Sequence, residues 1–173
     1  NKIYAEGEKT IRTAVCEKLL EENITIACAE SCTGGMVAAA FTDMPGISSV
    51  FIEGAVTYCN DAKMRRLGVK AETLDKYDAV SAETAMEMAE GIAKTSGADI
   101  GVSTTGIAGP GGGTEEKPVG TVWVAVKVRG NVTTHLLSLK DEGRENNINR
   151  TVLETLRLLI AHLENDGGIE FCD

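Results

Sequence analysis

Residues 29–35 read Ala-Glu-Ser-Cys-Thr-Gly-Gly, and this stretch decides the predicted fold. The short apolar run 24–28 precedes it, and the small-residue stretch 36–41 follows it. That order predicts a buried strand, a tight turn and a helix, with Ser31 raised at the turn. A hydroxyl there faces the first free N–H groups of a helix, which can stabilise a developing oxyanion. The turn resembles a nucleophile elbow in its geometry and its free N–H groups, although its sequence is not G-x-S-x-G. The simpler interpretation is a serine that caps the helix.

A second motif is the glycine-rich segment 99–121, which reads Asp-Ile-Gly-Val-Ser-Thr-Thr-Gly-Ile-Ala-Gly-Pro-Gly-Gly-Gly-Thr-Glu-Glu-Lys-Pro-Val-Gly-Thr. Its apolar start predicts a strand that runs into a long loop and then into another strand. Glycines let the loop backbone approach a ligand closely and direct N–H groups at it. The segment is not a Walker A loop, because no Gly-Lys-Ser/Thr follows the glycines. The alternative is a flexible surface hairpin loop.

A third segment supplies the base that a serine nucleophile needs. Residues 53–59 are strand-like, and Asn60 is predicted to cap a short helix over 61–67. Lys63 then lies in the first turn of that helix, where the helix dipole opposes a cation and favours the neutral amine. Neutral lysine is a competent general base for serine. The alternative is an ordinary solvated surface lysine.

Together these segments carry a family resemblance. The sequences AESCTGG at 29–35, YCNDAK at 58–63 and TGIAGPGGGTEEKPVGT at 105–121 resemble the CinA C-terminal domain family, over roughly residues 8–163. That family includes the stand-alone nicotinamide-nucleotide amidase. The resemblance implies hydrolysis of the carboxamide of nicotinamide mononucleotide to nicotinate mononucleotide and ammonia. It also implies a small-molecule partner and neither a metal nor a cofactor.

The resemblance assigns roles to particular residues. The family's nucleophile matches Ser31, with Lys63 as general base and Tyr58 beside it. The predicted oxyanion donors are the N–H groups of Cys32, Thr33 and Gly34, and the predicted substrate contacts are Ser48, Thr105, Gly106 and Arg144.

Two departures from the family pattern are small. Cys59 stands where the family commonly has serine, and Cys28 where it has threonine. Arg150 and Lys117 are the next candidates for phosphate recognition after Arg144. The role of Arg150 is left open, and Lys117 is better explained as a solvated loop charge.

Composition is that of a single compact domain over residues 1–173, with 167–173 as a frayed tail. A formal charge of −9 argues against nucleic acid as the main partner, because its phosphates would be repelled. No apolar run approaches the roughly 20 residues that span a membrane, and the start has no signal-peptide pattern. Five cysteines without a C-x-x-C motif fit a reducing compartment, so a cytoplasmic location is expected. We also expect a homo-oligomer, most simply a dimer.

Apolar periodicity predicts an α/β fold. Helix-like periods cover 10–23, 81–95 and 144–164, and alternating strands cover 121–129 and 132–139, joined by a turn at Gly130-Asn131. Helices and strands interleave early and a hairpin comes late. The prediction is a three-layer α/β/α sandwich with a mixed, mostly parallel sheet and the site at the carboxyl ends of the strands.

Two other classes of function stay open. In the first, the chain is a catalytically inactive nucleotide- or phosphate-binding domain, in which Ser31 caps a helix and the glycine-rich loop holds phosphate. In the second, Cys32 is a thiol nucleophile near a helix N-terminus, which favours thiolate. The spacing of Cys28 and Cys32 also allows a redox pair. His135 and His162 lie far from the motifs along the chain, which disfavours a serine–histidine pair.

Overall fold

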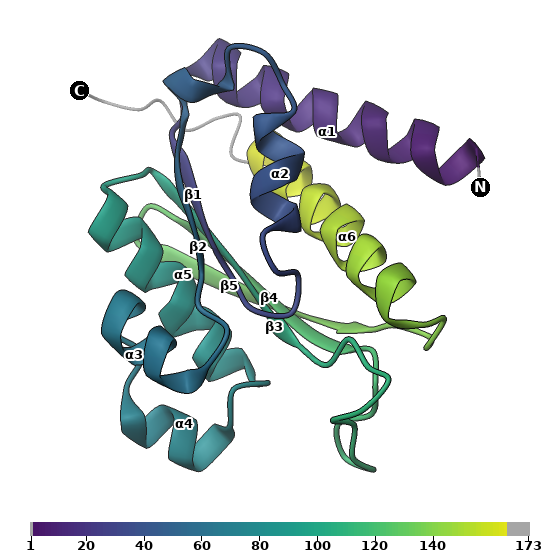
Figure 1. Cartoon of the computed structure of the whole chain (residues 1–173). Helices are drawn as coiled ribbons and strands as arrows, with labels where there is room; N and C mark the ends of the chain where they lie inside the picture. Colours follow the sequence, from purple (N-terminus) through teal and green to yellow (C-terminus); the bar gives the residue numbers. More distant parts are fainter. Residues whose placement is uncertain (1, 166–173) are drawn as a thin grey trace.

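A five-stranded mixed sheet forms the middle layer of the molecule, in the order β2-β1-β3-β4-β5 (Figure 1). The computed structural model describes the backbone of residues 2–165 and the side chains of residues 11–165. The strands are β1 (Ile26–Glu30), β2 (Phe51–Val56), β3 (Ile100–Gly106), β4 (Thr121–Val128) and β5 (Asn131–Ser138). β1 pairs in parallel with β2 and β3, whereas β4 is antiparallel to both β3 and β5. Every strand except β4 therefore runs in one direction, and the prediction of a mixed, mostly parallel sheet is confirmed.

Helices cover both faces of this sheet, as Figure 1 shows. One outer layer holds α1 (Lys2–Glu22), α2 (Met36–Thr42) and α6 (Arg144–Asn165). The other holds α3 (Asn60–Leu67), α4 (Ala71–Tyr77) and α5 (Ala82–Ser96). A short 3-10 turn, η1 (Ile47–Ser49), leads into β2. The three-layer α/β/α sandwich is thus confirmed.

The core follows from the sequence patterns. All five residues of β1 are buried, as expected for a strand covered on both faces. β4 alternates, and its inward valines 122, 124 and 126 pack with Leu156 and Leu159 of α6. On the other face, Met88 and Ile92 of α5 pack under β1. Within the described residues no helix has the length and apolarity that crossing a membrane requires.

Several local predictions need correction. The hairpin turn consists of Arg129 and Gly130, because Asn131 already pairs with Val128, and Arg129 takes the positive φ of 57°. The N-cap of α3 is Cys59, and Asn60 is the first helical residue. Helix α4 has no counterpart in the prediction. The expected tail at 167–173 lies outside the described residues.

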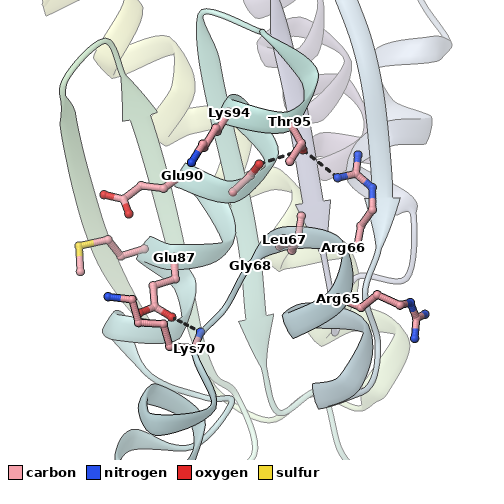
Figure 2. A pocket seen from close by; sticks show the side chains of 11 residues that line it. Arg65, Arg66, Leu67, Gly68, Lys70, Glu87, Glu90, Lys94 and Thr95 are labelled. Carbon is pink, nitrogen blue, oxygen red and sulfur yellow. Dashed lines mark hydrogen bonds between the residues drawn. The ribbon is translucent and has the colours of Figure 1, made fainter.

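The seam between α3 and α5 is unusually close. A Cβ added to Gly91 of α5 would lie 1.9 Å from the carbonyl oxygen of Leu67 at the end of α3. Figure 2 shows this seam and the groove of about 540 Å³ beside it. Arg66 donates to the Thr95 hydroxyl over 2.7 Å across the seam, and Glu87 accepts from the backbone N–H of Lys70. The glycine thus allows a contact that fixes the helix carrying Lys63.

Candidate active site

The carboxyl ends of β1, β2 and β3 meet at one edge of the sheet, and the predicted site residues follow them directly. Ser31 comes immediately after β1, and its backbone N–H donates to the Thr104 carbonyl of β3 over 3.0 Å. Gly34 and Gly35 then turn the chain into α2 with φ values of 58° and 102°, which favour glycine. The predicted strand, tight turn and helix around Ser31 are confirmed.

Lys63 is brought to Ser31 by the first turn of α3. Its Nζ lies 3.1 Å from Ser31 Oγ, 2.9 Å from the Thr57 carbonyl oxygen and 3.2 Å from the Tyr58 carbonyl oxygen. Only 1% of Lys63 is exposed, and Ser31 is 9% exposed. The prediction of a solvated surface lysine is therefore wrong.

The surroundings of Lys63 favour its neutral form. Burial lowers the pKa of the ammonium group from 10.5, against smaller opposing effects of Cys59 and Cys32. No acidic side chain forms an ion pair with it among the described residues. A neutral amine has two N–H groups and one lone pair. Two carbonyl oxygens take the N–H groups, so the lone pair is left for the Ser31 hydroxyl proton.

The helix end that was expected to face Ser31 is already occupied. The N–H groups of Val37 and Ala38, in the first turn of α2, donate to the Glu30 carboxylate over 2.8 and 3.1 Å. The Gly34 N–H donates to the Ser31 carbonyl over 3.1 Å. Of the three predicted oxyanion donors, Cys32 and Thr33 have no oxygen partner for their N–H groups within the described chain. Any oxyanion site is thus formed by the turn and not by the helix end.

A cavity of about 210 Å³ opens at the Ser31–Lys63 pair. It is lined by Ser31, Cys32, Tyr58, Asn60, Lys63, Ala79, Val80, Thr105, Gly106, Ala108 and Arg144. The structure therefore brings together three of the four predicted substrate contacts, namely Thr105, Gly106 and Arg144. The Thr105 hydroxyl donates to the Ala79 carbonyl over 2.8 Å, which ties β3 to the segment before α5.

Ser48 is not at this cavity. It lies in η1, which leads into the amino end of β2, whereas the cavity is at the carboxyl end of that strand. Six strand residues separate the two ends, which is about 20 Å at 3.3 Å per residue. Within one chain, Ser48 therefore lies away from the cavity at Ser31, and its contact with the substrate stays a prediction.

Tyr58 and Arg144 form the rim of the cavity. Arg144 donates to the Gly109 carbonyl over 2.8 Å and to the Tyr58 hydroxyl over 3.0 Å. Tyr58 is 58% exposed and meets Lys63 through its backbone carbonyl, not through its phenol. Tyr58 thus lies beside Lys63 as expected, but its phenol holds Arg144 and does not contact the amine.

The two other candidates for phosphate recognition, Lys117 and Arg150, lie outside the cavity. Lys117 donates to the Tyr77 carbonyl over 3.1 Å and lies 3.8 Å from Asp78. Arg150 lies 3.6 Å from Glu142. Neither is a lining residue, so Arg144 is the cation placed to meet an anionic substituent at the rim.

The thiol alternative does not fit the site. Cys32 is buried, and burial raises the pKa of its thiol to about 12, so it stays protonated at neutral pH. Cys28 is buried as well, and burial together with Glu30 raises the pKa of its thiol. Burial of Cys32 therefore disfavours a thiolate nucleophile at this position.

Sequence reasoning missed several residues of this site. Glu30 was part of the quoted motif, but a buried carboxylate in an otherwise apolar strand was not interpreted as a helix cap. Val80 and Ala108 form apolar walls of the cavity and carried no local signal. Asn60 was expected to cap α3 and instead lines the cavity.

The fold and the site define an α/β domain with a buried serine–lysine pair at the carboxyl edge of its sheet. A family model described as CinA C-terminal domain matches residues 8–163. The chain belongs to the CinA family, which confirms the resemblance seen in its motifs.

Curated relatives support this assignment. A competence-damage inducible protein of Clostridium novyi is 54% identical over 158 residues, which cover 90% of this chain and 38% of that protein. One of Clostridioides difficile is 52% identical over 161 residues, covering 92% of this chain and 38% of that protein. The chain thus spans about two fifths of the length of these relatives.

Solved structures agree with the fold. The competence/damage inducible protein CihA from Agrobacterium tumefaciens matches with a TM-score of 0.88 and 44% identity, over 91% of this chain and 96% of that one. A CinA superfamily protein from Klebsiella pneumoniae matches with a TM-score of 0.88 and 34% identity, over 91% of this chain and 98% of that one.

Proposed function

We propose that this chain is a nicotinamide-nucleotide amidase, which hydrolyses the carboxamide of nicotinamide mononucleotide to nicotinate mononucleotide and ammonia. The observation that carries the proposal is the buried pair of Ser31 Oγ and Lys63 Nζ, 3.1 Å apart at the mouth of a cavity. A buried lysine with a lowered pKa beside a serine hydroxyl is the arrangement that a serine acyl-enzyme mechanism needs. Membership of the CinA family is compatible with such an amidohydrolase.

The first half-reaction forms an acyl-enzyme. Ser31 Oγ attacks the carboxamide carbon while its proton moves to the neutral amine of Lys63. The oxyanion of the tetrahedral intermediate accepts from the N–H groups of Cys32 and Thr33. The carbon–nitrogen bond then breaks, and the ammonium of Lys63 returns its proton to the leaving nitrogen, which departs as ammonia. A Ser31 ester of the nicotinoyl group and a neutral Lys63 remain.

Water completes the second half-reaction. Lys63 removes a proton from the attacking water, the same N–H groups hold the oxyanion, and the ester bond to Ser31 Oγ breaks. The proton on Lys63 returns to Ser31 Oγ, and nicotinate mononucleotide forms as a carboxylic acid that releases its remaining proton to solvent. No step uses a metal or a cofactor.

The cavity sets how the substrate lies. At about 210 Å³ it is smaller than the roughly 300–1,000 Å³ of pockets that enclose a drug-sized ligand. It therefore takes the pyridine ring and its carboxamide, and the ribose phosphate extends to the rim. There the Arg144 guanidinium binds the phosphate, since its planar fork suits phosphate oxygens. We further propose that the chain acts on this small molecule in the cytoplasm as a homodimer, with neither nucleic acid nor a membrane as partner.

The test is ammonia release from nicotinamide mononucleotide by the purified chain and its Ser31→Ala variant. Loss of a covalent nucleophile lowers kcat by several orders of magnitude, about 10⁶-fold in one serine protease. A matched control is Ser103→Ala, which removes a buried hydroxyl bonded to the Ala85 carbonyl, away from the cavity. The control should retain its kcat.

Two outcomes would contradict the proposal. If the wild-type chain binds the mononucleotide but releases no ammonia, the inactive nucleotide-binding domain is the better description. If Ser31→Ala keeps more than about a tenth of the wild-type kcat, the serine mechanism is wrong, since a loss that small arises from indirect effects. A mass increase at Ser31 from trapped acyl-enzyme would support the mechanism directly.

A further inference from the structure

A buried carboxylate lies directly behind the nucleophile and has no part in the steps above. Glu30 is 1% exposed and immediately precedes Ser31. Its Oε1 accepts from the Val37 N–H over 2.8 Å, and its Oε2 accepts from the Ala38 N–H over 3.1 Å. Burying a carboxylate is costly unless it is fully hydrogen-bonded, so its position calls for a reason.

Two buried threonines extend this contact to the neighbouring strand. Thr33 and Thr104 are each 1% exposed. The Thr33 hydroxyl donates to Glu30 Oε1 over 2.6 Å and lies 2.7 Å from the Thr104 hydroxyl. Because the carboxylate accepts the Thr33 proton, the Thr104 hydroxyl is the donor in that second bond. The Thr104 backbone carbonyl accepts from the Ser31 N–H over 3.0 Å.

These bonds fasten the nucleophile turn at both ends. Its first residue, Ser31, is held through its backbone to β3, and its third, Thr33, is held through its side chain to Glu30 and Thr104. The helix that follows is held to the same carboxylate. The Cys32 N–H, a predicted oxyanion donor, lies between the two fixed points.

We propose that Glu30, with Thr33 and Thr104, is a positioning network that holds the Ser31 hydroxyl and the neighbouring N–H groups in their reactive arrangement. The inference rests on the proposed function only in taking Ser31 as the nucleophile. Glu30 does not touch substrate and is a positioning residue. Preorganised donors need no rearrangement in the transition state, which is why a carboxylate is retained at a buried position. Displacement of reacting groups by about 1 Å can cost about 10²-fold in rate.

The experiment measures the reactivity of Ser31 without the natural substrate. A fluorophosphonate probe reacts when Ser31 Oγ forms a bond to phosphorus, fluoride leaves, and Lys63 takes the hydroxyl proton. The modified residue is located by mass spectrometry in wild type, Glu30→Gln and Ser31→Ala. Glu30→Gln keeps the shape but places an NH₂ group against a backbone N–H. We expect its labelling rate to fall by at least about tenfold, with kcat for the mononucleotide falling in parallel and KM changing less than about threefold.

A second pair of variants guards against misfolding of Glu30→Gln. Thr104→Val removes the hydroxyl at constant shape, and Thr104→Ser retains it. Labelling should slow in the valine variant and recover in the serine variant. The matched control is Ser103→Ala, one residue earlier on the opposite face of β3, where a lost hydroxyl bond to the Ala85 carbonyl should lower stability but leave labelling unchanged.

The outcomes separate the two proposals. Labelling of Glu30→Gln and Thr104→Val at the wild-type rate would overturn the positioning role, as would a wild-type Ser31 that does not react at all. Slower labelling in step with melting temperature, with Ser103→Ala equally slow, would show a merely structural role and overturn it too. If wild type is labelled at Ser31 but releases no ammonia from the mononucleotide, the proposed substrate is wrong and the positioning role stands.

Discussion

Replacement of Lys63 is the sharpest test of how the site works. The Nζ atom contacts Ser31 Oγ at 3.1 Å and two backbone carbonyl oxygens at 2.9 and 3.2 Å. Lys63→Arg places a permanent positive charge at this position, because a guanidinium does not deprotonate in the working range and has no lone pair to accept the serine proton. We therefore expect the variant to bind substrate and to be nearly inactive.

The expected loss of activity follows from the role of Lys63 as general base. A positioned general base contributes about 10²–10⁴-fold to the rate, which is about 3–5 kcal/mol of activation free energy. A companion variant, Lys63→Met, removes the amine at similar length and should lose as much activity. It leaves the buried Thr57 carbonyl and the part-buried Tyr58 carbonyl without the amine, and the buried one alone costs about 1–3 kcal/mol. Circular dichroism and melting temperature then distinguish lost chemistry from lost folding.

The assay is ammonia release across pH. Burial lowers the pKa of Lys63 from 10.5, so kcat/KM of the wild type should rise with pH along a limb that ends below that value. A lysine that stays charged and attracts phosphate would behave differently. In that case Lys63→Arg would keep more than about a tenth of kcat and mainly change KM. That result would refute the assignment of Lys63 as base.

Three further predictions concern other parts of the molecule. Gly91→Ala gains about 1 kcal/mol of helix propensity but places a Cβ 1.9 Å from the carbonyl oxygen of Leu67. Thermal melting should therefore show a net loss of stability of about 1–3 kcal/mol, and kcat should fall because α3 shifts. Equal or higher stability would contradict this prediction. Burial, together with the nearby His162, lowers the pKa of His135 from 6.5, so the unfolded chain binds a proton at this histidine more readily than the folded chain. The melting temperature should therefore fall as the pH drops below about 6.5. In the control variant His135→Gln, the melting temperature should depend less on pH in this range. Arg144→Ala should raise KM for the mononucleotide by about 10–100-fold and narrow its preference over nicotinamide riboside, and an unchanged preference would place phosphate recognition elsewhere.

The turn around Ser31 could be predicted because its signals are local. An apolar run, a serine and two glycines within a few residues define a strand, a turn and a helix, and the parallel strands then bring their carboxyl ends together. The contact of Ser31 with Lys63 spans 32 residues, and that of Tyr58 with Arg144 spans 86. Distances of that kind follow from the packing of whole elements. The family resemblance therefore indicated the contact of Ser31 with Lys63, whereas the contact of Tyr58 with Arg144 is seen only in the structure.

Glu30 shows a different limit of prediction from sequence patterns. A carboxylate within a predicted buried strand conflicts with the apolar pattern, and pattern reasoning offers no partner for it. The partners are the first N–H groups of α2, which the same reasoning had assigned to an oxyanion. One helix end cannot serve both, and the internal carboxylate occupies it. The failed expectation that the end of α2 would stabilise an oxyanion and the missed role of Glu30 thus have a single physical cause.

The proposed substrate creates an electrostatic conflict at Lys63 that can be measured. A phosphate at the rim is an anion near the amine, and an anion favours the ammonium form. Arg144 offsets this charge, but a phosphate of charge near −2 is not cancelled by one guanidinium. The pyridinium ring carries a positive charge close to the amine in both the mononucleotide and the riboside, so these two substrates differ by the phosphate alone. The pKa of Lys63 should therefore be higher in the complex with the mononucleotide than in the complex with nicotinamide riboside. Because kcat reports the complex, its ascending limb should lie at higher pH for the mononucleotide than for the riboside. Coincident kcat limbs for the two substrates would mean that the phosphate does not bind near this end of the cavity.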